Sequence, residues 1–386
     1  FRFQELPFGK IVADSAGAVQ YKWGPISTNA SNDGFVDGWA RWNFTGYEGK
    51  TAYAEYHDLV ETMKSLGNDT AHGCGRALWE SSGELNKYGT TMSLMLLPHW
   101  TKGCIGSMEG LNFEASGTTP YHFITSAAMS KQSSNPVREL RYDNNDAGLG
   151  VRYMQELGVK YFLAFTKEAI AQANLQAALV EVKRSGPWVI YQVGNSELVV
   201  PLKVQPVIVN SRAGDVKERW LEIGTSWFQH PEDWSAVPVE KGLDTWQRVD
   251  VAIDLSRRDG APGVSSRRVD IVTPTQAIDL VETKPTKVTK FVLEDSAISF
   301  SVDQIGQPIL VRMSYFPNWK VSGAQGPFRV APNMMVVVPT QKDVRLYYGY
   351  TKLDIFAYLL TAIGLAVLFM RWRRRFNTRI IEAEIN

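Results

Sequence analysis

Two carboxylates lie close together in a segment of small residues. Glu109 and Glu114 are five residues apart in SMEGLNFEAS, and His99 and His122 flank this stretch. Paired carboxylates serve glycoside chemistry as general acid and base. A loop spacing of five residues sets no distance between the two carboxyl groups, and isolated acid pairs often cap turns or form surface ion pairs. Glu109 and Glu114 are therefore candidates for catalysis, and turn caps or surface ion pairs are the alternative for both.

Aromatic side chains are a second possible source of chemistry. Tryptophan and tyrosine rings stack on the apolar faces of sugars, while nearby polar groups bind the hydroxyls. Packing in an ordinary core is the alternative for the same rings. The candidate carbohydrate-binding residues are Trp39, Trp42, Trp79, Trp100, Tyr121 and His122.

Other chemistries have little support in the sequence. Glu55, His57 and Asp58 form an acidic cluster, but on a helix His57 points away from the other two, so we expect no metal site. Motifs of P-loop, dinucleotide-binding, serine-hydrolase and zinc-protease types are lacking from the sequence, and we expect no cofactor in this chain. A formal net charge of +1 gives no electrostatic reason to expect a nucleic-acid partner.

The two cysteines indicate a compartment. Cys74 and Cys104 lie in the glycine-flanked segments HGCGR and KGCIG, and such a pair in an exported protein predicts a disulfide. In the chain-entropy model, closing a loop of about thirty residues stabilises by ~3 to 4 kcal/mol. Two free thiols are the alternative.

The end of the chain resembles a membrane span. Residues 355–370 are uncharged and mostly apolar, and arginines crowd the segment that follows. We expect a transmembrane helix over residues 353–372, in contact with membrane lipid, and a cytoplasmic tail over 373–386, with everything before about residue 352 outside the cytoplasm. Tyr350, Tyr358 and Trp372 stand near the two ends, as interfacial aromatic residues do. A buried core helix is the alternative, although such helices rarely end in several arginines.

The first residues also affect the interpretation. The chain begins at Phe1, and its opening segment has neither the basic and apolar regions nor the cleavage site of a secretory signal. Because an exported region needs a signal or an earlier span, we expect either the C-terminal part of a longer membrane protein or a mature product. The first of these is the one we favour.

The candidate residues need a scaffold, for which we expect an α+β fold. Residues 1–50 are rich in Gly, Asn and aromatics and predict an irregular lead-in. Apolar residues at helical spacing in TAYAEYHDLVETMKSLGN predict a helix. The segment VRYMQELGVKYFLAFT predicts a helix that ends at Gly158 and is followed by a strand over 160–165, and KEAIAQANLQAALV predicts another helix. This alternation predicts an extracytoplasmic α/β domain over residues 51–184.

After about residue 185 the apolar period changes to two. Ile298, Phe300 and Val302 share one strand face, and residues 311, 313 and 315 and residues 344, 346 and 348 repeat the pattern. We expect an antiparallel β-sandwich over residues 185–350. Gly224 and Pro231 argue against a helix in the Trp-rich insert at 220–263, which we expect to be loop, together with RRDGAPGVSSRR.

The ending SYFPNWKVSGAQGPFRVAPNMMVVVPTQKDVRLYYGYTKLDIFAYLL carries a family resemblance. It resembles the C-terminus of YfhO-like and related polytopic membrane proteins of the glycosyltransferase-C type, including those labelled pyruvoyl-tetrahydropterin-synthase-related membrane proteins. There a Tyr-Phe-Pro-x-Trp strand and a Val-rich strand precede the last span. ELGVKYFLAFT and YGTTMSLMLLPHWTKGCIGSMEGLNFEASGTTPYHF are similar to other extracytoplasmic parts of that group.

The resemblance implies a lipid-linked sugar donor, an extracytoplasmic active site and an upstream transmembrane region of the same protein as a partner. The catalytic acid of such enzymes lies in an early external loop that this chain does not contain, so no catalytic residue is carried over. The chain would then help to bind or position an envelope glycan acceptor. A non-catalytic carbohydrate-binding or envelope-assembly module is the alternative, and a self-contained glycosidase using Glu109 or Glu114 is a third possibility.

Overall fold

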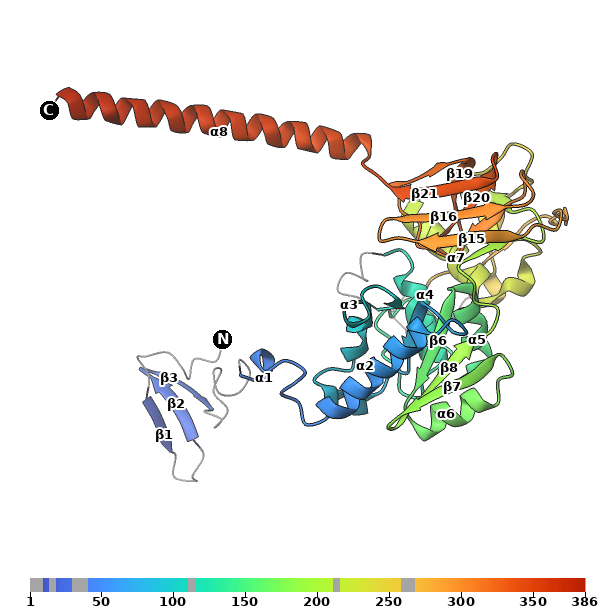
Figure 1. Cartoon of the computed structure of the whole chain (residues 1–386), viewed down its shortest axis with the longest axis horizontal. Coiled ribbons are helices and arrows are strands. Elements are labelled where there is room, and N and C mark those ends of the chain that lie inside the picture. Colours follow the sequence, from blue (N-terminus) through green and yellow to red (C-terminus); the bar gives the residue numbers. More distant parts are fainter. Residues whose placement is uncertain are drawn as a thin grey trace.

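A computed structural model describes residues 10–13, 19–29, 41–109, 116–210, 216–257 and 268–385 of the chain. The fold is mixed α+β, with several sheets and a long C-terminal helix (Figure 1). Near the N-terminus, β1 (Lys10–Ala13), β2 (Val19–Trp23) and β3 (Ile26–Asn29) form an antiparallel meander. The described part of residues 1–50 is therefore more regular than the expected lead-in, and a short helix, α1 (Arg41–Phe44), follows it.

The first large sheet has five strands. They are β4 (Gly75–Trp79), β5 (Ile105–Ser107), β6 (Val159–Ala164), β7 (Leu179–Ser185) and β8 (Trp188–Val193), in the order β5-β4-β6-β8-β7. The pairs of β4 with β5 and β6 are parallel, whereas β6 with β8 and β8 with β7 are antiparallel. Because β8 pairs with β6, this sheet continues past the boundary that the sequence placed after residue 184.

Helices cover both faces of this sheet. They are α2 (Tyr53–Asn68), η3 (Gly83–Tyr88), η4 (Ser93–Leu96), α3 (Leu97–Trp100), α4 (Thr119–Ala128), α5 (Ala147–Glu156) and α6 (Lys167–Asn174). Tyr161 and Leu163 face one apolar cluster with α2, while the alternate residue Phe162 faces a second cluster with α4 and α5, as the period of a strand requires.

Two of the expected helices are confirmed, and one is shorter than expected. The helix after residue 50 is α2, and α5 followed by β6 matches the predicted helix and strand around Gly158. The helical stretch from residue 167 ends as α6 at Asn174, and Leu179 already begins β7. Alanines favour a helix throughout that stretch, but pairing along β8 decides the structure of its end.

The five-stranded sheet and its helices form the first region of the molecule. Two further sheets form the second region. A seven-stranded sheet, ordered β12-β10-β11-β19-β20-β17-β9, contains β9 (Val199–Pro201), β10 (Val207–Val209), β11 (Pro238–Val239), β12 (Arg248–Val249), β17 (Ile309–Val311), β19 (Ala324–Val330) and β20 (Met334–Pro339). A four-stranded sheet, ordered β15-β16-β21-β18, contains β15 (Val288–Leu293), β16 (Ala297–Val302), β18 (Trp319–Ser322) and β21 (Asp343–Tyr348). A small pair joins β13 (Val251–Ile253) to β14 (Val272–Pro274).

The seven-stranded and four-stranded sheets face each other across an apolar cluster. Ile298, Phe300 and Val302 of β16 contribute one side of it, and Val337 of β20 contributes to the other. The alternation seen in the sequence therefore marks a real buried face. The expectation of purely antiparallel pairing was wrong, because β10 pairs in parallel with both β11 and β12.

The insert at 220–263 was expected to be loop, and this was also wrong. Its first part belongs to α7 (Val216–Gln229), and the short turns η6 (Pro231–Asp233) and η7 (Leu255–Arg257) follow, with strands between them. Gly224 lies inside the helix, where a Cβ atom would come 2.2 Å from the Tyr121 hydroxyl and 2.7 Å from the Pro332 carbonyl oxygen. The glycine therefore permits close packing, and Pro231 stands beyond the helix end. Most of RRDGAPGVSSRR lies outside the described residues.

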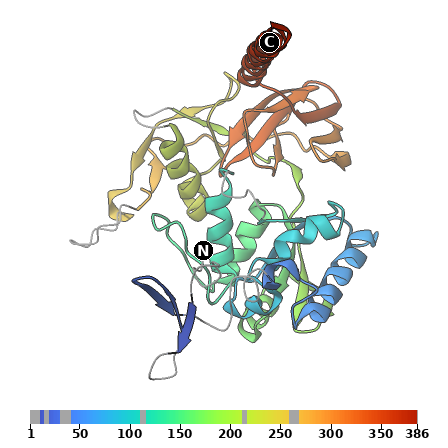
Figure 2. The same cartoon turned by 90° about the vertical axis from the view of Figure 1, so that its left-hand side faces the viewer.

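Helix α7 joins the two regions. The Phe228 ring stacks on Tyr153 of α5 with centroids 4.5 Å apart and meets the edge of Tyr121 of α4 at 5.3 Å. Arg152 donates to the carbonyl oxygens of Phe228 and Gln229. One apolar cluster includes residues of both regions, and Figure 2 shows α7 beside α4 at the junction.

The C-terminal helix α8 (Lys352–Ile385) extends away from the rest of the molecule (Figure 1). Residues 352–373 are long and apolar enough to cross a membrane, with a mean hydropathy of 2.2, and none of the most apolar window is buried against the protein. A buried core helix, the alternative from the sequence, does not match this placement. Apolar side chains that are exposed along a whole helix need an apolar surrounding such as lipid or other helices.

Candidate functional site

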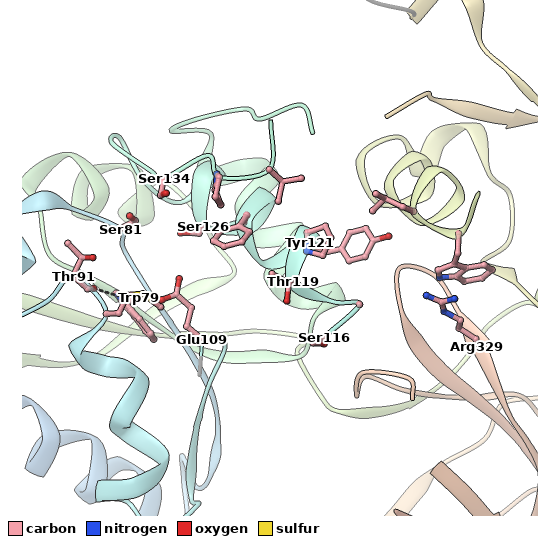
Figure 3. A pocket seen from close by; sticks show the side chains of 18 residues that line it. Trp79, Ser81, Thr91, Glu109, Ser116, Thr119, Tyr121, Ser126, Ser134 and Arg329 are labelled. Carbon is pink, nitrogen blue, oxygen red and sulfur yellow. Dashed lines mark hydrogen bonds between the residues drawn. The ribbon is translucent and has the colours of Figure 1, made fainter. Parts of the chain in front are cut away.

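A cavity of about 620 Å³ lies where the two regions meet. Its volume falls within the ~300 to 1,000 Å³ of typical small-ligand sites. One side comes from the loops after β4 and β5, from α4 and from the segment that follows α4, and the other side comes from α7 and β19 (Figure 3). The aromatic and charged side chains that line the cavity are those of Trp79, Glu109, Tyr121, Phe123, Trp220 and Arg329.

The cavity lies at the carboxyl edge of the parallel strands. Trp79 ends β4, Ser81 follows it, and Glu109 comes just after β5. The carboxyl ends of parallel strands are where α/β sheets usually bind ligands, most often at the point where the strand order reverses. The chain passes from β4 to β5 on one side and then to β6 on the other, so that point lies between β4 and β6.

The carboxylate of Glu80 occupies the point between β4 and β6 where the strand order reverses. Glu80 is almost completely buried, and its carboxylate accepts hydrogen bonds from the backbone amides of Phe165 and Thr166 at 2.8 Å and from the Thr166 hydroxyl at 2.6 Å. Thr166 is also the N-cap of α6, where a negative charge is favourable. Glu80 is therefore structural, and the open space lies on the β5 side.

Glu109 forms a close pair with a histidine. Its Oε1 atom lies 2.6 Å from Nε2 of His122, and the two side chains are 13% and 2% exposed. The backbone amide of Glu109 donates to the Ser107 hydroxyl at 3.1 Å, which closes the turn after β5. Figure 3 shows the Glu109 carboxylate at one end of the cavity. A carboxylate held this way can accept hydrogen bonds from the hydroxyls of a ligand.

Hydrogen bonds hold the two tryptophan rings of the cavity lining in place. Trp79 donates from Nε1 to the Thr91 carbonyl at 3.2 Å, and Trp220 donates from Nε1 to the Pro332 carbonyl at 2.9 Å. Tyr121 is fully buried, and this burial raises the pKa of its hydroxyl. The rings thus present apolar faces at fixed positions. Hydroxyl groups of Ser81, Thr91, Ser116, Thr119, Ser126 and Ser134 line the same space.

Arg329 lies at the other end of the cavity, with Tyr121 and Thr119 between it and Glu109 in Figure 3. It belongs to β19, which pairs with the Val-rich strand β20 in the second region. Burial lowers the pKa of its guanidinium from the ordinary value. Opposite charges thus stand at the two ends of a mainly apolar space.

The structure brings some of the expected sugar-binding residues together and separates others. Trp79 and Tyr121 line the cavity, and His122 supports Glu109 from behind. Trp100 instead donates from Nε1 to the Tyr56 hydroxyl at 3.0 Å and packs against the cluster beside α2. Trp42 is exposed, with Lys50 lying 4.0 Å from its ring centroid.

Two of the expected site residues, Trp39 and Glu114, lie outside the described residues. Sequence reasoning also missed Trp220, Leu221 and Arg329. Trp220 and Leu221 were assigned to a loop, and Arg329 follows a proline and a phenylalanine in a strand with no motif around it. No local signal connects these residues to Trp79, because the cavity exists only once α7 and β19 pack against α4.

The cysteines and the acidic cluster take structural places. Cys74 and Cys104 form a disulfide, as predicted. Glu55 turns towards the core, where it accepts from the Tyr88 hydroxyl and pairs with Lys87 at 2.6 Å. In the part of the chain that the structure describes, no three His, Cys, Asp or Glu side chains are grouped to hold a metal ion.

A second cavity, of about 510 Å³, lies near the amino edge of β4. Its cations already have partners: Arg76 donates to the carbonyls of Leu157 and Arg312, and Lys160 donates to those of His72 and Cys74. Burial lowers the pKa of Arg76 to about 10. The contact of Arg76 with Arg312 joins the two regions. Because these cations already have partners, the first cavity is the better candidate for a ligand.

Comparison with known proteins found no match to a family model, a curated protein or a solved structure. The resemblance to glycosyltransferase-C proteins therefore stays a prediction.

Proposed function

We propose that this chain is an exported module on a membrane helix that binds a glycan in the cavity between its two regions. One observation carries the proposal: fixed aromatic side chains, hydroxyl groups and one carboxylate line a cavity of about 620 Å³. Aromatic faces suit the C–H faces of sugars, and hydroxyls and carboxylates suit their hydroxyls. This combination is less suited to a purely apolar ligand, since the polar groups would lose water without compensation.

Membrane attachment belongs to the same proposal. Helix α8 crosses the membrane at residues 353–372, and the arginines that follow lie in the cytoplasm with the tail, residues 373–386. The sheets and the cavity are then extracytoplasmic. The Cys74–Cys104 disulfide supports this side of the membrane, because disulfides persist in oxidising compartments.

In the parent protein, the module positions an envelope glycan as the acceptor for transfer from a lipid-linked sugar. The catalytic residue lies elsewhere in the parent, in the upstream transmembrane region with which this module works. A non-catalytic carbohydrate-binding or envelope-assembly module would use the same cavity without that partner.

Binding fits the cavity better than hydrolysis does. Glycosidases need two carboxyl groups across the scissile bond. Among the described residues that line the cavity, Glu109 is the one carboxylate. A glycosidase role for Glu109 would require a second carboxylate from another segment.

The test uses the whole chain in lipid nanodiscs and measures the binding of short neutral and acidic oligosaccharides by calorimetry. Phe123→Ala removes a half-buried ring from the cavity wall, and Trp42→Ala removes an exposed ring elsewhere. We expect Phe123→Ala to weaken binding about tenfold or more and Trp42→Ala to leave it unchanged. The proposal fails if no oligosaccharide binds, or if only Trp42→Ala reduces the affinity.

A further inference from the structure

The guanidinium of Arg329 is held rigidly beside the cavity. Its Nε atom donates to the Oδ1 atom of Asn333 at 2.8 Å, and its central carbon lies 4.8 Å from the Trp220 ring centroid and 5.8 Å from that of Tyr315. Stacking on aromatic faces and one fixed hydrogen bond restrict an arginine to one orientation.

The support for Arg329 comes from both regions. The side chain of Asn333 packs on Gly117, where a Cβ atom would come 2.7 Å from Nδ2 of Asn333. Asn333 also donates from Nδ2 to the Thr118 hydroxyl at 3.5 Å, and this hydroxyl lies 2.6 Å from that of Ser314. The segment before α4 thus braces the residue that orients the guanidinium.

The two terminal nitrogens of Arg329 have no hydrogen-bond acceptor among the described residues, and Arg329 forms no direct ion pair there. Among the described residues, the carboxylate of Glu240 acts on the guanidinium electrostatically without forming a direct ion pair. An arginine is a fork of donors that matches a carboxylate or a phosphate through two parallel hydrogen bonds. The half-buried guanidinium of Arg329, whose fork has no acceptor among the described residues, can bind an anion in this way.

We propose that Arg329 selects the ligand of this cavity by binding the carboxylate or phosphate group of an acidic sugar. This inference rests on the proposed glycan-binding function and adds its substrate class. Glu109, at the opposite end, would repel a second anionic group and accept hydrogen bonds from hydroxyls, so the two charges together set the direction in which the sugar lies.

The experiment compares pairs of ligands that differ in charge. The whole chain in nanodiscs made of neutral lipid is titrated with trigalacturonate and with its methyl ester, and separately with galactose 6-phosphate and with galactose. We expect the acidic member of at least one pair to bind about tenfold or more tightly than its neutral counterpart. The pair that shows the difference tells a carboxylate ligand from a phosphate ligand.

The variants separate charge from shape. Arg329→Gln should remove the preference for the acidic ligand and leave binding of the neutral one within about twofold, whereas Arg329→Lys, which keeps the charge but loses the fork, should retain part of it. Arg345→Gln is the matched control, because Arg345 is an exposed arginine of β21 that pairs with Glu294. This variant should leave the preference for the acidic ligand unchanged. Thermal unfolding of each variant checks that the fold survives.

The outcomes distinguish the two proposals. Equal binding of acidic and neutral sugars to the wild type, or an unchanged preference in a folded Arg329→Gln variant, overturns the role of Arg329 and leaves glycan binding intact. If none of the four ligands binds, the inference fails. If none of the oligosaccharides of the calorimetry test binds either, the proposed glycan-binding function is also wrong.

Discussion

Asn318 donates a hydrogen bond from Nδ2 to Oδ2 of Asp354 at 3.0 Å and thereby ties the four-stranded sheet to the first turn of α8. The same carboxylate accepts from the amide and the hydroxyl of Thr351, and the Asp354 amide donates back to that hydroxyl at 3.2 Å. This is a capping box in which a residue of the Tyr-Phe-Pro-Asn-Trp segment takes part. Asn318 also donates to the Gly349 carbonyl at 2.9 Å. The direction in which the helix leaves the sheet is therefore set by side chains.

Replacing Asp354 by Ala should loosen this junction. The substitution removes the acceptor for Asn318 and the half of the capping box in which Asp354 accepts from Thr351, so we expect amide hydrogen exchange at residues 351–356 to become about three- to tenfold faster in nanodiscs. Asp295→Ala, at the exposed tip between β15 and β16, is the control. Equal exchange in the Asp354→Ala variant and the wild type would mean that the lipid alone orients the helix.

Reducing the disulfide should destabilise the region around β4 and β5. Cys104 packs on α2, because a Cβ atom at Gly67 would lie 2.6 Å from its sulfur. For a loop with a sequence separation of 30, we expect the Cys74→Ser, Cys104→Ser double variant to lose about 3 kcal/mol in the free energy of unfolding. Denaturant unfolding measures the loss, and a reducing agent should produce a similar loss in the wild type and none in the variant.

Local patterns predicted the elements but not the cavity. Apolar spacing identified α2, α5 and β16 because each buries one face against a neighbour, and the cysteine pair predicted its own bond. Helix α7 was missed because Gly224 and the nearby Pro231 are local helix breakers in the sequence. The reason for the glycine, the hydroxyl of Tyr121 packed against it, lies about a hundred residues earlier in the chain.

The candidate site was predictable only in part, for the same reason. Glu109, Trp79 and Tyr121 were recognisable by residue type, since carboxylates and aromatic rings suggest sugar chemistry wherever they stand. Arg329 and Trp220 become site residues only through the contact between the two regions. A single sequence carries no periodic or motif signal for a contact made across such a distance along the chain.

Gly224→Ala should test the packing of α7 on α4. The added methyl group would meet the Tyr121 hydroxyl and the Pro332 carbonyl, and overpacking of this kind costs about 1 to 3 kcal/mol. Thermal and denaturant unfolding measure the effect. Gly364→Ala, in α8 where a Cβ atom meets nothing within 4 Å, should have little effect. Adding Tyr121→Phe to Gly224→Ala removes the closest clash, so this double variant should recover part of the lost stability.

Glu80→Gln should show that the carboxylate of Glu80 serves stability, whereas that of Glu109 serves ligand binding. The amide oxygen can still accept from the amides of Phe165 and Thr166, but the NH₂ group takes the place of the oxygen that accepts from the Thr166 hydroxyl, so we expect a loss of about 1 to 3 kcal/mol in the free energy of unfolding. Glu84→Gln, in the exposed part of η3, is the control and should change stability little. Glu109→Gln should have the opposite profile, with weaker binding of glycan hydroxyls and a smaller effect on stability. A Glu80→Gln variant that unfolds like the wild type would show that the reversal point between β4 and β6 does not depend on a carboxylate and could admit a ligand.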